Sequence, residues 1–313
     1  MWSYLIKRIL SVIPVLLVVI TIVFLMLRLT PGDPAANIAG DAATSEDIAQ
    51  LRIDLGLEEP LPVQFFVYTR NLLQGDLGDS YYYKRPVISM VADGIGPTVS
   101  LALFTIFIAV VVAVPLGTWA AYRQGLWIDR IVMGFSVIGF SVPVFVIGYL
   151  LIYFLSVKLD LFPVQGYQPI GEGIAGWAYR LVLPSMTLSV IFIALIARMT
   201  RTSVLEVLNE DYIRTARAKG LSERRVLIKH ALRNAAVPIV TIIGIAIAVL
   251  ISGVVVTESV FVIPGLGLLT LDAIQGRDYP TVQALILLFS VVYVMINLII
   301  DLLYSLLDPR IRY

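Results

Sequence analysis

The fold is decided by the stretch Thr98–Ala121, which reads TVSLALFTIFIAVVVAVPLGTWAA and contains no charged residue. A helix of about 20 apolar residues is long enough to cross a bilayer. Five further stretches are equally apolar or nearly so: Ile9–Leu27, Ile131–Val157, Leu181–Ala197, Ala235–Thr257 and Tyr279–Leu303. We therefore predict an all-α integral membrane protein with six transmembrane helices.

The composition of the chain supports this fold class. Of 313 residues, 59% are hydrophobic and 14% are charged, with a mean hydropathy of +0.91, whereas soluble domains carry about 25% charged residues. The chain has no cysteine, which excludes disulfides, thiol nucleophiles and thiolate metal sites. Its one histidine, His230, leaves no histidine-rich metal site. We predict that this chain itself holds no metal and no cofactor.

The first 27 residues resemble a signal peptide, because Lys7 and Arg8 precede an apolar run. No small-residue cleavage site follows, so we expect a retained helix. The expected organisation is a first transmembrane helix over residues 1–29, an extracytoplasmic segment over 30–97, a core over 98–305 and a cytoplasmic tail over 306–313.

The distribution of Lys and Arg predicts the orientation in the membrane. With the N-terminus in the cytoplasm, the cytoplasmic segments hold 15 basic residues, nine of them between Arg198 and Arg233. The outer segments hold the other 8, spread over nearly twice the length. Because basic residues are retained in cytoplasmic loops, we expect both termini in the cytoplasm.

The outer segment, about Thr30 to Pro97, is long and acidic, with ten Asp and Glu residues. Thr44-Ser-Glu-Asp followed by spaced apolar residues predicts a short capped helix. Gly75-Asp-Leu-Gly-Asp-Ser80 predicts a turn that leads into an extended piece. We expect a small folded unit there.

Several chemistries have no motif in this sequence. It contains no Gly-x-x-x-x-Gly-Lys phosphate loop, no Gly-x-Ser-x-Gly elbow and no His-Glu-x-x-His pair. The predicted spans carry few charges. Glu258 lies at the end of the fifth, and Asp301 lies near the inner end of the last, where we expect its side chain either to reach the membrane interface or to pair with Arg198 or Arg201. A proton-driven transporter relies on such charges, so we expect energy to come from another chain.

A basic, helix-breaking stretch from Asp211 to Pro238 separates the fourth and fifth spans. Ser203 and Glu206 have the spacing of a capping box, and Val204, Leu208, Tyr212 and Ala216 recur every fourth residue, so we expect one helix there. Gly220 can take the left-handed conformation that ends it, and Ser222 can cap a second helix. Two short helices that meet at Gly220 would offer a docking surface.

This stretch resembles the cytoplasmic loop of bacterial ABC-importer permeases, whose pattern is Glu-Ala-Ala, three residues, Gly, nine residues and Ile-x-Leu-Pro. Gly220 takes the glycine position, whereas Arg214-Thr215-Ala216 stand where the pattern has Glu-Ala-Ala, and Pro238 lies further from the glycine than the pattern sets it. Tyr212-Ile-Arg-Thr-Ala-Arg-Ala-Lys-Gly-Leu-Ser222 and His230-Ala-Leu-Arg-Asn-Ala235 are closer to the dipeptide/oligopeptide branch.

The resemblance covers nearly the whole chain. Further matching motifs are Thr30-Pro-Gly-Asp-Pro34, Gly75-Asp-Leu-Gly-Asp-Ser80, Glu258-Ser-Val-Phe-Val-Ile-Pro-Gly-Leu-Gly267, Arg277-Asp-Tyr-Pro280 and Asp301-Leu-Leu-Tyr-Ser-Leu-Leu-Asp-Pro-Arg-Ile-Arg312. The long outer segment is similar to that of the B-type subunit of this branch.

The resemblance implies a type I ABC-importer permease in a bacterial inner membrane, which imports dipeptides or oligopeptides and catalyses no reaction itself. The implied partners are a second, C-type permease, two ATPase subunits that bind ATP and Mg²⁺, an extracytoplasmic solute-binding protein and the lipid bilayer, with no nucleic acid. Nickel, glutathione and opine-like solutes stay open. A secondary transporter, which would need no partner subunits, is a distant alternative.

The resemblance also implies which residues act. A coupling loop over 202–236 would contact an ATPase through Asp211, Arg214, Thr215, Ala216, Arg217, Ala218, Lys219, Gly220, Leu221 and Ser222. The alternative is a basic topology signal that binds anionic headgroups. Pro264, Gly265 and Gly267 prevent a continuing helix, so the chain either turns back into the outer mouth of a pathway or forms an ordinary surface turn.

Overall fold

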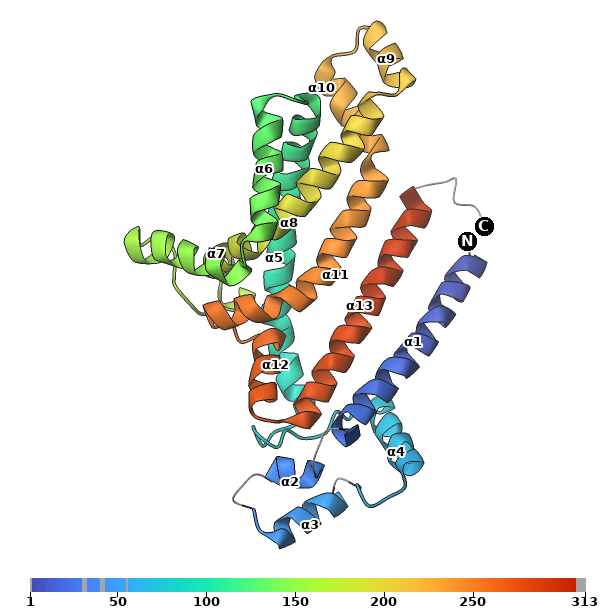
Figure 1. The fold of residues 1–313 in the computed structure, drawn as a ribbon, viewed down its shortest axis with the longest axis vertical. Helices are drawn as coiled ribbons and strands as arrows, with labels where there is room; N and C mark the ends of the chain where they lie inside the picture. The colour runs from blue at the N-terminus through green and yellow to red at the C-terminus, as the bar shows by residue number, and fades with distance from the viewer. Residues whose placement is uncertain (1, 30–32, 40–42, 55, 308–313) are drawn as a thin grey trace. The chain divides into compact units, whose positions relative to one another are not determined.

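The computed structural model describes residues 2–29, 33–39, 43–54 and 56–307, and within them every regular element is a helix (Figure 1). The chain divides into two compact units. The first unit comprises Pro97–Ile263 and the chain from Ile296 onward; the second comprises Trp2–Gly96 and Pro264–Met295. The α-helices are α1 (Trp2–Leu29), α2 (Pro34–Ala39), α3 (Ser45–Asp54), α4 (Leu61–Leu73), α5 (Val87–Tyr122), α6 (Trp127–Ser141), α7 (Val144–Leu151), α8 (Ile174–Leu208), α9 (Asp211–Ala218), α10 (Glu223–Arg225), α11 (Ala236–Phe261), α12 (Leu266–Gln275) and α13 (Tyr279–Leu307).

Two π-helices and one 3₁₀ turn complete the described structure. They are η1 (Ile152–Lys158) and η3 (Val226–Leu232), which are π-helical, and η2 (Ile170–Glu172), which is 3₁₀. Seven-residue π-helices are rare and often lie at functional sites. Nothing in the apolar pattern of the sequence distinguishes them from α-helix.

The prediction of an all-α membrane protein is confirmed. Helices α1, α5, α8 and α13 are each long and apolar enough to cross a bilayer, and up to seven spans result when each of three bent helix pairs counts as one. The predicted six lies within that range. Helix α13 ends at Leu307, and the rest of the predicted tail lies outside the described residues.

The third predicted span, Ile131–Val157, is wrong as one continuous helix. It is broken into α6 and a second piece, α7 with η1, which are bent by 104°. Val142 at the break is extended, with φ −92° and ψ 125°, and Pro143 precedes α7. Proline has no N–H to donate and disfavours helical geometry in the residue before it, so the helix ends there.

The second predicted span starts earlier than its apolar run. Helix α5 begins at Val87 rather than near Thr98 and contains Pro97 and Pro115. Its first turns are held in the second unit, where Val87 and Val91 are buried against Leu266 and Leu285. Burial of apolar side chains stabilises a helix well outside the membrane-spanning length.

The core of the first unit is built around α8, against which α6, α7 and α11 pack. Small residues allow close approach, as they do in other membrane bundles. A Cβ added to Gly139 in α6 would lie 3.1 Å from the Cβ of Ala194, and one added to Gly117 in α5 would lie 2.5 Å from the carbonyl oxygen of Ala197. Both glycines therefore fix the distance between neighbouring helices.

In the second unit, the predicted capped helix is confirmed as α3. The Thr44 hydroxyl donates to the Asp47 carboxylate at 2.7 Å and accepts from the Asp47 backbone N–H at 3.2 Å. The second prediction, for Gly75–Ser80, is wrong in detail: the chain turns at Gln74–Gly75, but residues 76–80 form no turn, and Tyr81–Tyr83, expected to be extended, form one. Ser80, just before this turn, is fixed to the buried Asp278, whose Oδ2 accepts the Ser80 hydroxyl at 2.6 Å. Asp278 thereby holds this turn to the start of α13.

Candidate functional site

The candidate site is the knuckle, which we define as residues 209–232, between the end of α8 and the start of α11. Figure 1 shows α9 and α10 together where α8 finishes. Helix α9 ends at Ala218, and Gly220 adopts φ +74°, the left-handed conformation predicted for it. A Cβ at Gly220 would meet no atom within 4 Å, so this glycine serves the turn and not a close contact.

Both helical parts of the knuckle contain buried apolar side chains. Ile213 of α9 is 0% exposed and Ala216 is 7% exposed, and Val226 and Ala231 of η3 are 0% exposed. Helix α9 packs on η3. Ala216 is therefore largely buried within the chain, and its predicted contact with a partner stays a prediction. Leu221 is half-buried, and the other eight predicted contact residues are exposed.

Two arginines of the knuckle form ion pairs within it. Arg217 donates two hydrogen bonds to Glu223 across the Gly220 turn, with Nε–Oε1 at 2.9 Å and Nη2–Oε2 at 3.3 Å. Arg214 pairs with Asp211 within α9 at 3.3 Å. Such exposed pairs contribute about 1 kcal/mol at most. Arg217 therefore supports the turn as well as presenting charge.

Three local predictions for the knuckle need correction. Ser203 and Glu206 form no capping box, because α8 continues to Leu208 and Ser203 is buried within it. The four-residue repeat from Val204 to Ala216 does not lie on one helix, since the chain breaks after Leu208 and restarts at Asp211. The coupling loop predicted over 202–236 accordingly begins inside α8. Ser222 does stand at the N-cap of α10, but its side chain makes no capping hydrogen bond.

The predicted outer-mouth turn is a break between α11 and α12. Val262 at the end of α11 has φ +50°, and Gly265 is the N-cap of α12. Gly267 lies inside α12 and is buried, so Pro264 and Gly265 form the break and Gly267 does not. A Cβ added to Gly94 of α5 would lie 2.9 Å from Leu266 Cδ2, which shows how closely α5 approaches this turn.

One ion pair that joins two helices was not predicted from the sequence. Asp129 of α6 accepts from Arg201 of α8 at Oδ1 and Oδ2, at 2.6 and 2.8 Å, and its side chain is 7% exposed. Arg201 thus pairs with Asp129, and the guanidinium carbon of Arg198 lies 5.5 Å from the centre of the Phe140 ring. The pair predicted for Asp301 with Arg198 or Arg201 stays a prediction. The Asp301 side chain is outside the described residues. Glu258 is 0% exposed and accepts the Thr98 hydroxyl at 2.6 Å.

Two family models match the chain. The model described as "Binding-protein-dependent transport system inner membrane component" matches residues 113–313, and its N-terminal counterpart matches residues 1–102. The chain belongs to the family of binding-protein-dependent transport system inner membrane components. This permease family implies a multi-pass protein of the inner membrane that works with ATPase and binding-protein partners.

Relatives of this permease match it from end to end. A probable peptide ABC transporter permease of Sinorhizobium fredii is 52% identical over 313 residues, covering 100% of both chains. The glutathione transport system permease protein GsiC of Salmonella choleraesuis is 44% identical with the same coverage. A putative peptide transport system permease of Brucella abortus is 43% identical, again over the full length of both.

A solved structure shows the same fold for the permease. It is an inward-facing conformation of the MetNI methionine ABC transporter, and it matches with a TM-score of 0.59 at 20% identity. The match covers 71% of this chain and 97% of that one. The type I ABC-importer permease fold predicted from the sequence is thereby confirmed.

Within the described residues, no group of three His, Asp or Glu side chains is placed to hold a metal ion. Whether ATP and Mg²⁺ bind only to partner subunits stays a prediction.

Proposed function

We propose that this permease is the B-type subunit of an ATP-driven importer of dipeptides or oligopeptides. It would line the translocation path together with a second, C-type permease and contact two ATPase subunits through the knuckle. One observation carries the coupling part of the proposal. The knuckle is a two-helix unit, held by the packing of α9 on η3 and by the Arg217–Glu223 pair, and its outer face is exposed and basic, which suits a docking element.

The geometry of the knuckle suits the transmission of movement. Its internal contacts, the packing of α9 on η3 and the Arg217–Glu223 pair, favour movement as one body. It joins α8, the helix at the centre of the first unit, to η3 and α11. ATP, with Mg²⁺, would close the partner ATPase subunits and displace the knuckle, and α8 and α11 would then shift the bundle toward the outward-open state. The chain itself catalyses nothing in this scheme.

The solute is proposed from the relatives. The names of the Sinorhizobium and Brucella relatives specify peptide transport, and the Salmonella relative is named for glutathione, which is itself a tripeptide. A peptide is therefore the favoured solute, with glutathione next and nickel or opine-like solutes behind it. A proton-driven transporter is disfavoured, because few charged residues lie in the apolar helices; of these, Asp129 pairs with Arg201 and Glu258 accepts the Thr98 hydroxyl.

Replacing Gly220 by Trp in the assembled complex tests the coupling role. We expect normal membrane insertion but loss of solute-stimulated ATPase activity, because a bulky side chain on the exposed face of the knuckle would sterically prevent contact with the ATPase subunit. Gly125, between α5 and α6, is the matched control, since its φ is +77° and a Cβ there would also meet nothing within 4 Å. The two substitutions impose the same backbone strain, about 1–2 kcal/mol.

The control separates coupling from folding. Gly125→Trp should leave stimulated ATPase activity close to that of the wild type. Stimulated activity that survives in Gly220→Trp, or that is lost equally in both variants, would contradict the coupling role of the knuckle.

A further inference from the structure

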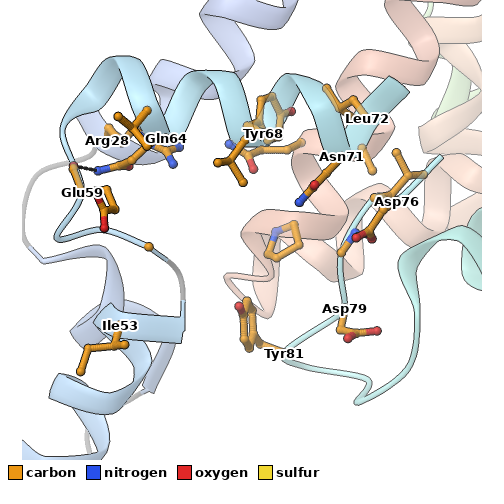
Figure 2. A pocket seen from close by; sticks show the side chains of 18 residues that line it. Arg28, Ile53, Glu59, Gln64, Tyr68, Asn71, Leu72, Asp76, Asp79 and Tyr81 are labelled. Carbon is orange, nitrogen blue, oxygen red and sulfur yellow. Dashed lines mark hydrogen bonds between the residues drawn. The ribbon is translucent and has the colours of Figure 1, made fainter. Parts of the chain in front are cut away.

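A cavity of about 380 Å³ lies within the second unit. It is lined by the end of α1, by α4 with the chain on either side of it, and by the first turns of α13, and it is partly open to the surroundings. Figure 2 shows Arg28 joined to Gln64 at one end, Asp76 and Asp79 at the other, and Asn71 of α4 between them. This volume lies in the range of small-molecule sites, and the coupling mechanism does not use it.

The walls of the cavity are fixed by contacts inside the second unit. The Phe24 ring of α1 meets the Phe65 ring of α4 edge-on, with centroids 5.2 Å apart. The buried Gln64 side chain donates to the carbonyl oxygens of Leu57 and Glu59, and Gln283 of α13 donates to the Val23 carbonyl at 2.8 Å. The cavity is therefore preformed, which lowers the entropic cost of filling it.

Arg28 brings a half-buried positive charge to this cavity. Its Nε donates to Gln64 Oε1 at 2.8 Å and its Nη1 to the Phe24 carbonyl at 3.0 Å, and its guanidinium carbon lies 3.7 Å from the Phe24 ring centre. Both acceptors are neutral oxygens, so these contacts orient the guanidinium without neutralising it. The planar fork of an arginine matches a phosphate well.

The cavity lies where two helices leave the hydrocarbon. The apolar window of α1 ends at Met26, just before Arg28, and that of α13 begins at Tyr279, next to the lining residue Pro280. Arginine and tyrosine at helix ends are typical of the headgroup level of a bilayer. A ligand in this cavity can therefore be part of the membrane.

Helix α4 presents apolar side chains beside the cavity. Val63 and Val67 line it and are 44% and 47% exposed, and Phe66 of the same helix is 69% exposed. A helix with an exposed apolar face outside the spans is suited to lie in the membrane interface. An acyl chain could follow this face away from a headgroup held in the cavity.

Acidic side chains set the charge that the ligand must carry. Glu59, Asp76 and Asp79 line the cavity together with the single cation Arg28, and Glu59 lies at the same end as Arg28 (Figure 2). A headgroup with net negative charge would be repelled by these carboxylates. A primary ammonium group in the ligand would offset the negative charge of these carboxylates and donate hydrogen bonds to them. A quaternary ammonium has no N–H and cannot donate.

We propose that this cavity is a specific site for a phospholipid of the phosphatidylethanolamine type. Arg28 and the Tyr68 hydroxyl bind its phosphate, and the Glu59 carboxylate accepts from its primary ammonium. Burial raises the pKa of Tyr68 to about 12, so its hydroxyl remains a donor at neutral pH. A free peptide carries the same pair of charges, but the exposed apolar face of α4 favours the lipid.

Native mass spectrometry of the full-length chain in detergent tests the site, with phosphatidylethanolamine, phosphatidylcholine and phosphatidylglycerol added at equal concentration. We expect at least tenfold stronger retention of phosphatidylethanolamine than of the other two. Arg28→Gln should lose about tenfold, whereas Arg70→Gln, an exposed arginine on α4 that does not line the cavity, should match the wild type. Glu59→Gln should raise the retention of phosphatidylglycerol.

Three results would overturn the proposal: equal retention of the three lipids, unchanged retention in Arg28→Gln, or displacement of the ethanolamine lipid by millimolar dialanine. A further measurement uses the wild-type chain and so does not depend on whether the variants fold. Phosphatidylethanolamine with a photoreactive headgroup should label peptides within residues 56–81, and labelling confined to other regions would also refute the site.

Discussion

At the scale of single residues, the Asp129–Arg201 pair is the interaction whose loss should cost most. Asp129 accepts two hydrogen bonds from Arg201 and one from the Gly125 N–H, and the Asp129 and Arg201 side chains are 7% and 20% exposed. Asp129→Asn leaves the Arg201 charge without its carboxylate, so we expect a loss of about 3 kcal/mol, read as a lower melting temperature in detergent. The control is Asp93→Asn, which breaks the exposed Arg85–Asp93 pair and should cost about 1 kcal/mol or less. Equal shifts in the two variants would show that burial of the first pair contributes nothing.

The sequence predicts single residues where the backbone alone decides their role. Gly220 could be assigned its left-handed conformation because glycine adopts it at little cost. Asp129 could not be matched with Arg201, because the two residues are 72 positions apart and only the packing of α6 on α8 brings them together. The same applies to Ala216, whose burial depends on where α9 begins.

At the scale of elements, the π-helix η3 sets the rotation of the knuckle relative to α11. A π-helical segment carries an extra residue compared with an α-helix, and one residue corresponds to about 100° of helix rotation. Deleting the exposed Ile228 should convert η3 to α-helix and turn the docking face away from its partner. We expect normal insertion and loss of solute-stimulated ATPase activity, with Ile228→Ala retaining activity as the control. Full activity of the deletion variant would refute a role for the π-helix in aiming the knuckle.

The sequence locates apolar elements well but not their breaks. Pro143 ends α6, whereas α8 contains Pro184 in its interior and continues as one helix. The difference comes from packing: a Cβ on Gly148 of α7 would lie 3.3 Å from Thr187 of α8 and 3.5 Å from Phe261 of α11. These contacts hold α7 at its angle to α6, and they join residues that no local pattern connects.

At the scale of the whole molecule, the family fold was predictable because six apolar runs and several long motifs all indicate the same architecture. The division of the chain into two compact units was not predictable from the sequence. The second unit combines Trp2–Gly96 with Pro264–Met295, so the described residues of the segment predicted over 30–97 belong, up to Gly96, to one unit with α1, α12 and the first part of α13. Asp278, which is 0% exposed, joins these distant segments through Ser80 and the Tyr81 N–H. Hydrophobic runs carry no information on such pairings.

The orientation of the chain in the membrane can be tested directly, because the protein has no cysteine. Single cysteines can be introduced at Ser222 of the knuckle and at Ser45 of α3, which are both exposed. Neither serine side chain is needed for a helix cap, because Thr44 caps α3 and the Ser222 side chain makes no capping hydrogen bond. The excess of basic residues around the knuckle predicts a cytoplasmic location for it. A membrane-impermeant maleimide added to intact spheroplasts should therefore label Ser45→Cys and not Ser222→Cys, and lysis should make Ser222→Cys reactive. Labelling of Ser222→Cys in intact spheroplasts would place the knuckle outside, beyond the reach of any cytoplasmic ATPase.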